Sequence, residues 1–248
     1  MVRKIAVAAT IIGLTAGPSR DARAQDSPRW LLGASGGVQA ANSGFAQTQR
    51  FPLNAEIATL NADYRVGVGR SFDGELAGRI WRSLLIGVDV SDFRKSGRVQ
   101  VAASLPHPLL FNRPRAVSGD SGEAGRTEFG VHMWIGWLLS IGHRSDLRVG
   151  GGPSYVRLDQ SLVSAVDYTE TFPFNTATFA GVSTEHRKDG TMGANVGVDL
   201  TMLLRRHVGV GAGVRFSRAT ANVDSIDGTT LSVDVGGFQI VAGVRARF

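Results

Sequence analysis

The 248-residue sequence contains no cysteine, which excludes disulfide bonds and thiolate metal sites. It has no Gly-x-Ser-x-Gly motif, and none of its five histidines has a second histidine at metal-binding spacing. Beyond the N-terminal segment, polar or charged residues interrupt every apolar run before the roughly 20 residues that a membrane-spanning helix needs. We therefore predict no enzyme, no catalytic residue, no metal and no cofactor.

The formal net charge of +6 raises the question of nucleic acid as a partner. The basic residues are scattered along the chain, however, and they do not alternate with aromatic residues that could stack on bases. The N-terminus also predicts export from the cytoplasm. Nucleic acid is therefore not expected as a partner.

Residues 1–24 have the pattern of a cleaved signal peptide. Arg3 and Lys4 supply the positive start, 5–17 is an uncharged apolar run of about thirteen residues, and Ala22-Arg-Ala24 gives the small-residue cleavage pattern. The run is shorter than a spanning helix requires. We expect one mature domain at residues 25–248.

The remaining chain consists of segments in which apolar residues alternate with polar residues or glycine. This period of two is typical of β-strands with one apolar face. It predicts eight strands, at about 30–40, 66–80, 84–91, 128–139, 147–155, 194–202, 208–217 and 233–248. In the last strand the apolar residues change from odd to even positions at Gly236-Gly237, which predicts a β-bulge there.

The connections between these strands are alternately long and short. Long connections cover 41–65, 95–126 and 160–191, whereas the second, fourth and sixth strands end in tight turns. Bacterial outer-membrane barrels have short periplasmic turns, long external loops and an even strand number. Eleven residues tilted by about 40° span roughly 25 Å, the height of the apolar band of such barrels. The predicted fold is all-β: an eight-stranded antiparallel transmembrane β-barrel.

This topology places aromatic residues at both ends of the apolar band. The periplasmic end receives Trp30, Trp137 and Phe248, and the outer end receives Phe129, Tyr155, Phe216 and Phe238. Two aromatic girdles are typical of outer-membrane barrels.

The signal peptide, the eight strands, the asymmetric loops and the terminal Val-Arg-Ala-Arg-Phe248 together resemble the small outer-membrane β-barrel proteins of Gram-negative bacteria, of the outer-membrane protein A/X-like superfamily. The resemblance implies residence in the bacterial outer membrane, contact with its lipid, and insertion by the barrel-assembly machinery. It also implies that Phe248, with Val244, Ala242 and Ile240, forms the assembly signal. Members of this superfamily differ widely in activity.

Charged residues occupy the inward positions of the predicted strands. The predicted lumen network contains Asp73, Glu75, Arg79, Asp89, Glu128, His132, Arg148, Asp199, Arg215 and Arg245, with Arg247 beyond them. One interpretation is a salt-bridged plug that satisfies buried charges; the other is an ion path gated by rearrangement of the pairs.

Two predicted external loops carry apolar residues between prolines. One contains Leu109, Leu110 and Phe111, and the other contains Phe172 and Phe174. These clusters either pack on each other as a cap or bind an extracellular or envelope ligand. We predict an integral outer-membrane protein with a structural or surface-interaction role. The alternatives are a narrow channel for small solutes and a periplasmic barrel that binds a lipophile in an apolar lumen.

Overall fold

The computed structural model describes residues 29–40, 44–225 and 228–248, so the predicted signal peptide lies outside the described residues. These residues contain ten antiparallel strands and no helix that could span a membrane. The strands are β1 (Trp30–Ala40), β2 (Phe45–Leu53), β3 (Glu56–Tyr64), β4 (Val68–Trp81), β5 (Leu84–Leu105), β6 (Arg115–Ser140), β7 (Ser145–Glu170), β8 (Ala177–Leu203), β9 (Val208–Asp224) and β10 (Thr230–Arg247).

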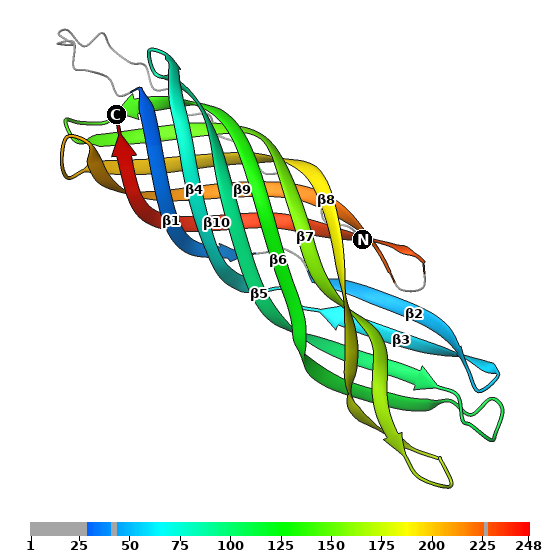
Figure 1. The fold of residues 1–248 in the computed structure, drawn as a ribbon. Helices are drawn as coiled ribbons and strands as arrows, with labels where there is room; N and C mark the ends of the chain where they lie inside the picture. The colour runs from blue at the N-terminus through cyan, green and yellow to red at the C-terminus, as the bar shows by residue number, and fades with distance from the viewer. Residues whose placement is uncertain (1–28, 41–43, 226–227) are drawn as a thin grey trace, which may run out of the picture.

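Eight of these strands close into a ring, which confirms the predicted fold (Figure 1). The order around the ring is β1-β4-β5-β6-β7-β8-β9-β10, and β10 returns to β1 from Ala40↔Phe238 to Leu31↔Arg247. Closure removes every free strand edge at this level, which a bilayer requires because no water is present to satisfy backbone groups.

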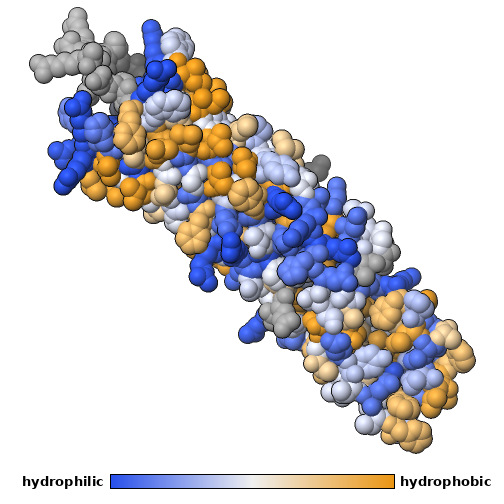
Figure 2. Space-filling view, viewed as in Figure 1, coloured by the Kyte–Doolittle hydropathy of each residue, from blue (hydrophilic) through white to orange (hydrophobic). Residues whose placement is uncertain are grey.

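The outer face of the ring is apolar. Large side chains are exposed there because hydrocarbon, not water, is the surrounding medium. They include Leu32, Leu76, Ile86, Ile135, Val196, Leu200, Val210, Ile240 and Val244. All seven predicted girdle residues are exposed at the ends of this belt, together with Phe72 and Trp81. The belt occupies one end of an elongated molecule, and a more hydrophilic zone follows it (Figure 2).

Beyond the belt the strands continue, and the polarity of their two faces reverses. On β7, Val149 points outward within the belt, whereas Val156 and Leu158 are buried inside the molecule above it. The inner face there forms a core that includes Leu60, Tyr64, Val101, Leu105, Leu162, Ala221 and Val233. Once water replaces lipid outside, burial of apolar side chains is favourable only on the inside.

This reversal corrects the prediction of a β-bulge at Gly236-Gly237. The pairing of β10 with β9 runs without a shift from Val235↔Ala219 to Phe238↔Phe216. Val233 and Val235 are buried on the same side of the strand as Gln239. The change of apolar residues from odd to even positions therefore marks the boundary of the belt. Odd-numbered residues face inward on both sides of Gly236-Gly237.

The long connections were predicted as loops, but most of their residues are strands. β5 and β6 continue to a turn at 106–114, and β7 and β8 continue to a turn at 171–176. The segment 41–65 was predicted as a connection in which 55–64 is either loop or an extension of the second strand. It contains the β2–β3 hairpin, whose Tyr64 to Thr59 pair with Val99 to Ser104 of β5. These hairpins project from the barrel in one direction (Figure 1).

Tyr64 joins three strands of the external core. Its hydroxyl donates to Oε1 of Gln47 at 2.6 Å and accepts from the backbone N–H of Val163 at 2.6 Å. Burial raises the pKa of Tyr64 to about 12, although the Val163 hydrogen bond partly opposes this shift.

Replacing Tyr64 by phenylalanine should lower the free energy of unfolding by about 1–3 kcal/mol, because the Gln47 and Val163 groups lose a buried partner. An unfolded tyrosine titrates near pH 10. The wild type should therefore keep this contribution below pH 10 and lose it as the pH rises towards 12. Urea unfolding of both proteins at pH 8 and at pH 11 measures the difference. An equal gap between them at the two pH values would contradict the burial of the phenol.

Candidate functional site in the barrel lumen

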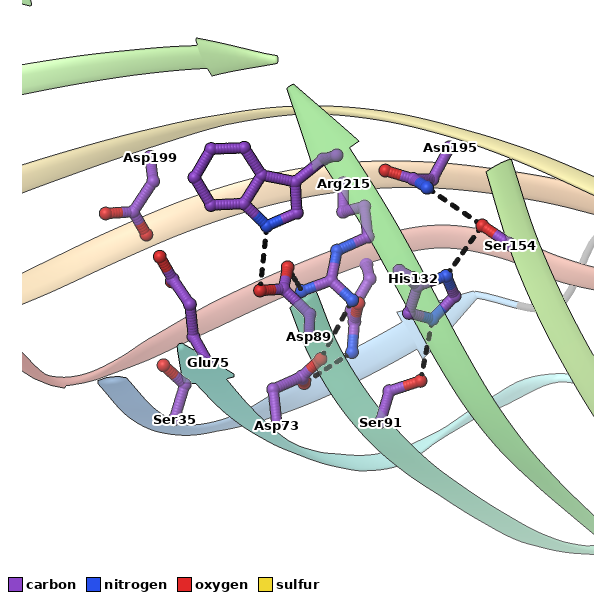
Figure 3. A network of polar contacts seen from close by, with 12 residues as sticks. Ser35, Asp73, Glu75, Asp89, Ser91, His132, Ser154, Asn195, Asp199 and Arg215 are labelled. Atoms are coloured by element: carbon purple, nitrogen blue, oxygen red, sulfur yellow. Dashed lines mark hydrogen bonds and ion pairs between the residues drawn. The ribbon is translucent and has the colours of Figure 1, made fainter. Parts of the chain in front are cut away.

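The lumen at the level of the belt is filled by charged side chains (Figure 3). All ten residues of the predicted network project inward, and Asp89, Glu128, His132, Asp199 and Arg245 are buried. The alternation of strand side chains explains this placement, since their neighbours along each strand face lipid.

Arg215 on β9 joins two carboxylates from the opposite wall. Its Nη1 lies 3.1 Å from Oδ1 of Asp73 on β4, and its Nη2 lies 2.9 Å from Oδ2 of Asp89 on β5. Asp89 also accepts a hydrogen bond from Nε1 of Trp134 at 3.0 Å. Asp73 accepts one from Nε2 of Gln239 at 2.6 Å. One cation therefore holds two buried anions and bridges three strands.

A second group of ion pairs lies beside the first. Arg245 on β10 contacts Asp199 at 2.6 Å and also donates to the hydroxyl of Ser35 at 2.6 Å. Arg148 on β7 pairs with Glu75 and lies 4.3 Å from the centre of the Trp134 ring. Each charge has an opposite charge and at least one further contact, as buried ions require.

His132 links the hydroxyl groups of two serines. Its Nε2 is 2.9 Å from Oγ of Ser91, and its Nδ1 is 2.8 Å from Oγ of Ser154, which also accepts from Nδ2 of Asn195 at 2.9 Å (Figure 3). Both ring nitrogens are therefore occupied. Among the described residues, no group of three potential metal ligands comes together.

Glu128 has a partner that the sequence analysis missed. Arg126 precedes it by two residues on the same face of β6, and the two side chains pair at 2.6 Å. Glu128 also accepts from the N–H of Gly236 at 2.9 Å, and Arg126 donates to the carbonyl of Asp234 at 2.7 Å. The Arg126–Glu128 pair thus binds backbone groups of β10 at Asp234 and Gly236. These groups lie beyond Phe238, where the pairing of β10 with β1 ends. The sequence did offer a signal for this partner, because Arg126 is two residues from Glu128 and therefore faces the same, inward side of the strand.

Arg79 belongs to the periplasmic rim. Its Nη1 donates to the carbonyl of Arg82 in the β4–β5 turn at 2.9 Å. Arg247 also lies at this rim and pairs with Asp146 at 3.1 Å. The network therefore has a central part of ion pairs and a separate rim part.

Little space remains between the central side chains. The room open to the centres of water molecules is about 40 Å³, enough for about three waters at ~10–15 Å³ each. An apolar group of Ala77, Leu85 and Trp134, with Leu31 and Leu138 against it, lies next to this network. The external core lies on the opposite side. This geometry favours a plug over an ion path.

The C-terminal residue completes ring closure. The carbonyl of Phe248 accepts from the N–H of Trp30 at 2.9 Å, and its own N–H donates to the carbonyl of Trp30 at 3.0 Å. Its ring is exposed at the lipid-facing rim, in line with Ile240 and Val244.

Deleting Phe248 should impair insertion into the outer membrane without impairing export, because the final strand loses its terminal aromatic residue and its last contacts with β1. The fraction of heat-modifiable, folded protein should fall, and unfolded protein should accumulate in the periplasm. The substitution Phe248→Tyr, which keeps an aromatic residue at the C-terminus, is the matched control. Normal insertion of the deletion variant would remove the assembly-signal interpretation.

The predicted apolar loop clusters lie at the two most distant turns. Leu109, Leu110, Phe111 and Phe172 are exposed, Phe111 by 72% and Phe172 by 79%. These side chains are exposed, so the prediction that they pack together as a cap over the barrel mouth is wrong for them. The external core covers the mouth instead. Phe174 is half-buried and packs edge-on against Phe172, with ring centres 5.8 Å apart.

A closed eight-stranded ring with a lipid-facing apolar belt, two aromatic girdles and a charged lumen defines an integral outer-membrane β-barrel. The chain is similar to outer membrane protein OprG from Pseudomonas aeruginosa, at 10% identity and a TM-score of 0.47 over 90% of this chain and 96% of that one. It is also similar to Neisserial surface protein A, at 14% identity and a TM-score of 0.48 over 90% of this chain and 98% of that one. A third similar structure is the outer membrane protease OmpT from Escherichia coli, at 9% identity and a TM-score of 0.48 over 89% of this chain and 97% of that one. No protein-family model and no curated protein matches the sequence.

Proposed function

We propose that this outer-membrane barrel is a surface-interaction protein that binds a protein partner outside the cell through its two apolar turns. The observation that carries the proposal is the exposure of Leu109, Leu110, Phe111 and Phe172 at the far end of rigid strands. Exposed clusters of large apolar side chains in water are characteristic of interaction sites. We name these four residues the tip patch.

The tip patch is held well away from the membrane. From Val156 to Glu170, β7 continues beyond the belt for roughly 45 Å of strand at about 3.3 Å per residue. Even at a tilt of about 40°, this length of strand rises roughly 35 Å, which would carry the patch past the lipid headgroups.

Arg115 ties the bases of the two turns together. Its Nη2 donates to the carbonyl of Pro106 at 3.0 Å in one turn, and its Nη1 donates to the carbonyl of Phe174 at 3.2 Å in the other. It also pairs with Glu170, and its side chain is buried. A patch held in this way loses little conformational entropy on binding.

The experiment compares bacteria that display the wild type with bacteria that display Leu109→Ser/Phe111→Ser/Phe172→Ser. Adhesion is measured on cultured cell layers and on plates coated with extracellular-matrix proteins. The wild type should adhere several-fold above cells without the protein, and the triple variant should return to that background. Arg113→Gln, in the same turn, is the control and should adhere like the wild type. Equal adhesion of the triple variant and the wild type, at equal surface display, would overturn the proposal.

Planar-bilayer conductance separates the proposal from the channel alternative. Planar-bilayer recordings of the wild type should show no stable single-channel steps, because the plug leaves room for only a few waters. Stable steps that change on replacing Arg215 would favour transport. The lipophile alternative requires an apolar lumen at belt level, where the structure instead has ion pairs.

Proteolysis of intact cells tests which end is external. Proteinase K should cut within 106–114 or 171–176, and the strand extensions around these turns should resist it because their backbone is paired. The Arg205-Arg206 turn should be spared until the outer membrane is opened. Cleavage at Arg205-Arg206 in intact cells would invert the topology.

A further inference from the structure

The external wall of the molecule has an opening between the end of β3 at Tyr64 and the start of β4 at Val68. One edge of β5 pairs with two strands in turn. It pairs with β4 as far as Arg94↔Arg70, and it pairs with β3 from Val99↔Tyr64 onward. Residues 95–98 of β5 therefore have no strand partner on this side, because residues 65–67 connect β3 to β4 without pairing. We call this opening the wall notch.

Hollows lie on both sides of the wall notch, and Lys95 and Arg126 line both of them. The outer hollow has about 1130 Å³ of empty space, part of it open to solvent. Its other lining residues include Arg70, Phe72, Asp92, Arg94 and Thr127. The inner hollow is lined by residues that include Tyr64, Arg65, Arg98 and Gln160.

Among the side chains that the structure describes, those lining the wall notch carry more positive than negative charge. Six cations line the two hollows: Arg65, Arg70, Arg94, Lys95, Arg98 and Arg126. Among the described side chains, two of these cations pair with a carboxylate: Arg94 with Asp92 at 2.8 Å and Arg126 with Glu128 at 2.6 Å. Among the described residues, Arg70, Lys95 and Arg98 form no ion pair. The excess charge favours an anionic ligand.

A second, independent observation concerns Arg126. Its side chain is 98% buried, and two of its nitrogens are bound by Glu128 and by the Asp234 carbonyl. The remaining nitrogen, Nη1, has no hydrogen-bond acceptor among the described residues. A buried donor without a partner is unfavourable, and an oxygen of a bound anion in the inner hollow would satisfy it.

The position of the wall notch identifies the source of the anion. Arg70 lies two residues above Phe72, which is exposed to lipid at the outer girdle. The notch is therefore level with the headgroups of the outer leaflet, and the apolar face of β4 and β5 continues below it with Leu76 and Val90. A lipid bound there would place its phosphate among the cations and its acyl chains on the belt.

We propose that the wall notch binds the phosphate monoester of a lipid headgroup. Arg70 and Arg94 contact the phosphate from the lipid side, Lys95 contacts it within the opening, and Arg126 supplies a donor from the interior. Arginine and lysine suit this ligand because charge-assisted hydrogen bonds to phosphate are about twice as strong as neutral ones.

The test uses the full-length mature protein in nanodiscs that contain equal amounts of phosphatidic acid, phosphatidylglycerol and phosphatidylcholine. Native mass spectrometry then measures which lipid the protein retains. Phosphatidic acid, the monoester, should be retained about tenfold over phosphatidylcholine, as expected for about one charge-assisted hydrogen bond. Phosphatidylglycerol, a diester, should be intermediate. Equal retention of the three lipids would overturn the proposal.

Variants locate the site. Arg70→Gln/Lys95→Gln should abolish the preference for phosphatidic acid, whereas Arg157→Gln/Arg218→Gln, exposed positions just above the outer girdle on other strands, should keep it. If the first variant fails to assemble, Arg94→Gln, whose side chain is 75% exposed, should still weaken the preference. An unchanged preference in the notch variants would overturn the assignment. Inorganic phosphate that displaces phosphatidic acid at equal concentration would show a free-anion site and overturn the choice of lipid.

Discussion

Replacing Val196 by arginine should lower the free energy of unfolding by about 2–4 kcal/mol. Val196 lies on the lipid-facing side of β8 and is 54% exposed, which places its side chain in hydrocarbon. A guanidinium there loses its hydration and finds no counter-ion. The folded fraction in heat-modifiability gels should fall, and urea unfolding in lipid vesicles gives the magnitude. Val131→Arg, on the outward face of β6, should behave similarly.

Ala102→Arg provides the matched control. Ala102 is also an exposed residue on the outer face of a strand, but it lies on β5 in the external part. Arginine at that position faces water, so the free energy of unfolding should change by less than about 0.5 kcal/mol. If both variants are equally stable, the apolar belt does not face lipid and the membrane assignment fails.

Replacing Arg215 by methionine should lower the free energy of unfolding by about 3–5 kcal/mol, because Asp73 and Asp89 are then buried without their common cation. Both carboxylates lie at 5% side-chain exposure, so water screens them little. Urea unfolding in vesicles measures the loss. Arg218→Met, which breaks the exposed pair with Asp234, should change stability by no more than about 1 kcal/mol.

A compensated variant separates the missing cation from the change in packing. Asp73→Asn/Asp89→Asn/Arg215→Met removes the whole charged group, and most of the lost stability should return because no uncompensated ion remains. If the triple variant is as unstable as Arg215→Met, packing explains the loss, and the plug is not an electrostatic device. Planar-bilayer recordings on Arg215→Met would also show whether the lumen conducts once this plug is broken.

The sequence was sufficient for the membrane part of the fold. Within the belt every strand has one apolar face, so the alternation around Ile240 and Val196 identifies both the strands and their outward sides. The same alternation assigned the ten residues of the predicted network to inward positions, but it did not separate Arg79 at the rim from the central ion pairs. Their partners could not be predicted, because Arg215 meets Asp73 and Asp89 only after β4, β5 and β9 have been brought around one ring.

The external part was predicted less well for a physical reason. A period of two shows which face of a strand is apolar, but it does not show whether that face meets lipid or the interior of the protein. Val233 and Val235 face inward and Ile240 faces outward, although all three lie on one continuous strand. The β2–β3 hairpin was missed because the inward positions of β2 include Gln47 and Gln49, so this strand has no continuous apolar face to identify it.

The amino-acid sequence by itself determined the strands of the belt, their sidedness and the charged content of the lumen, because these depend only on the order of apolar and polar residues along each strand. Only the tertiary structure decided which charges pair, where the apolar core changes from outside to inside, and that Arg126 lies beside an opening in the wall. Those features depend on ring closure, on strand register and on which medium meets each apolar face, and a local pattern does not identify any of the three.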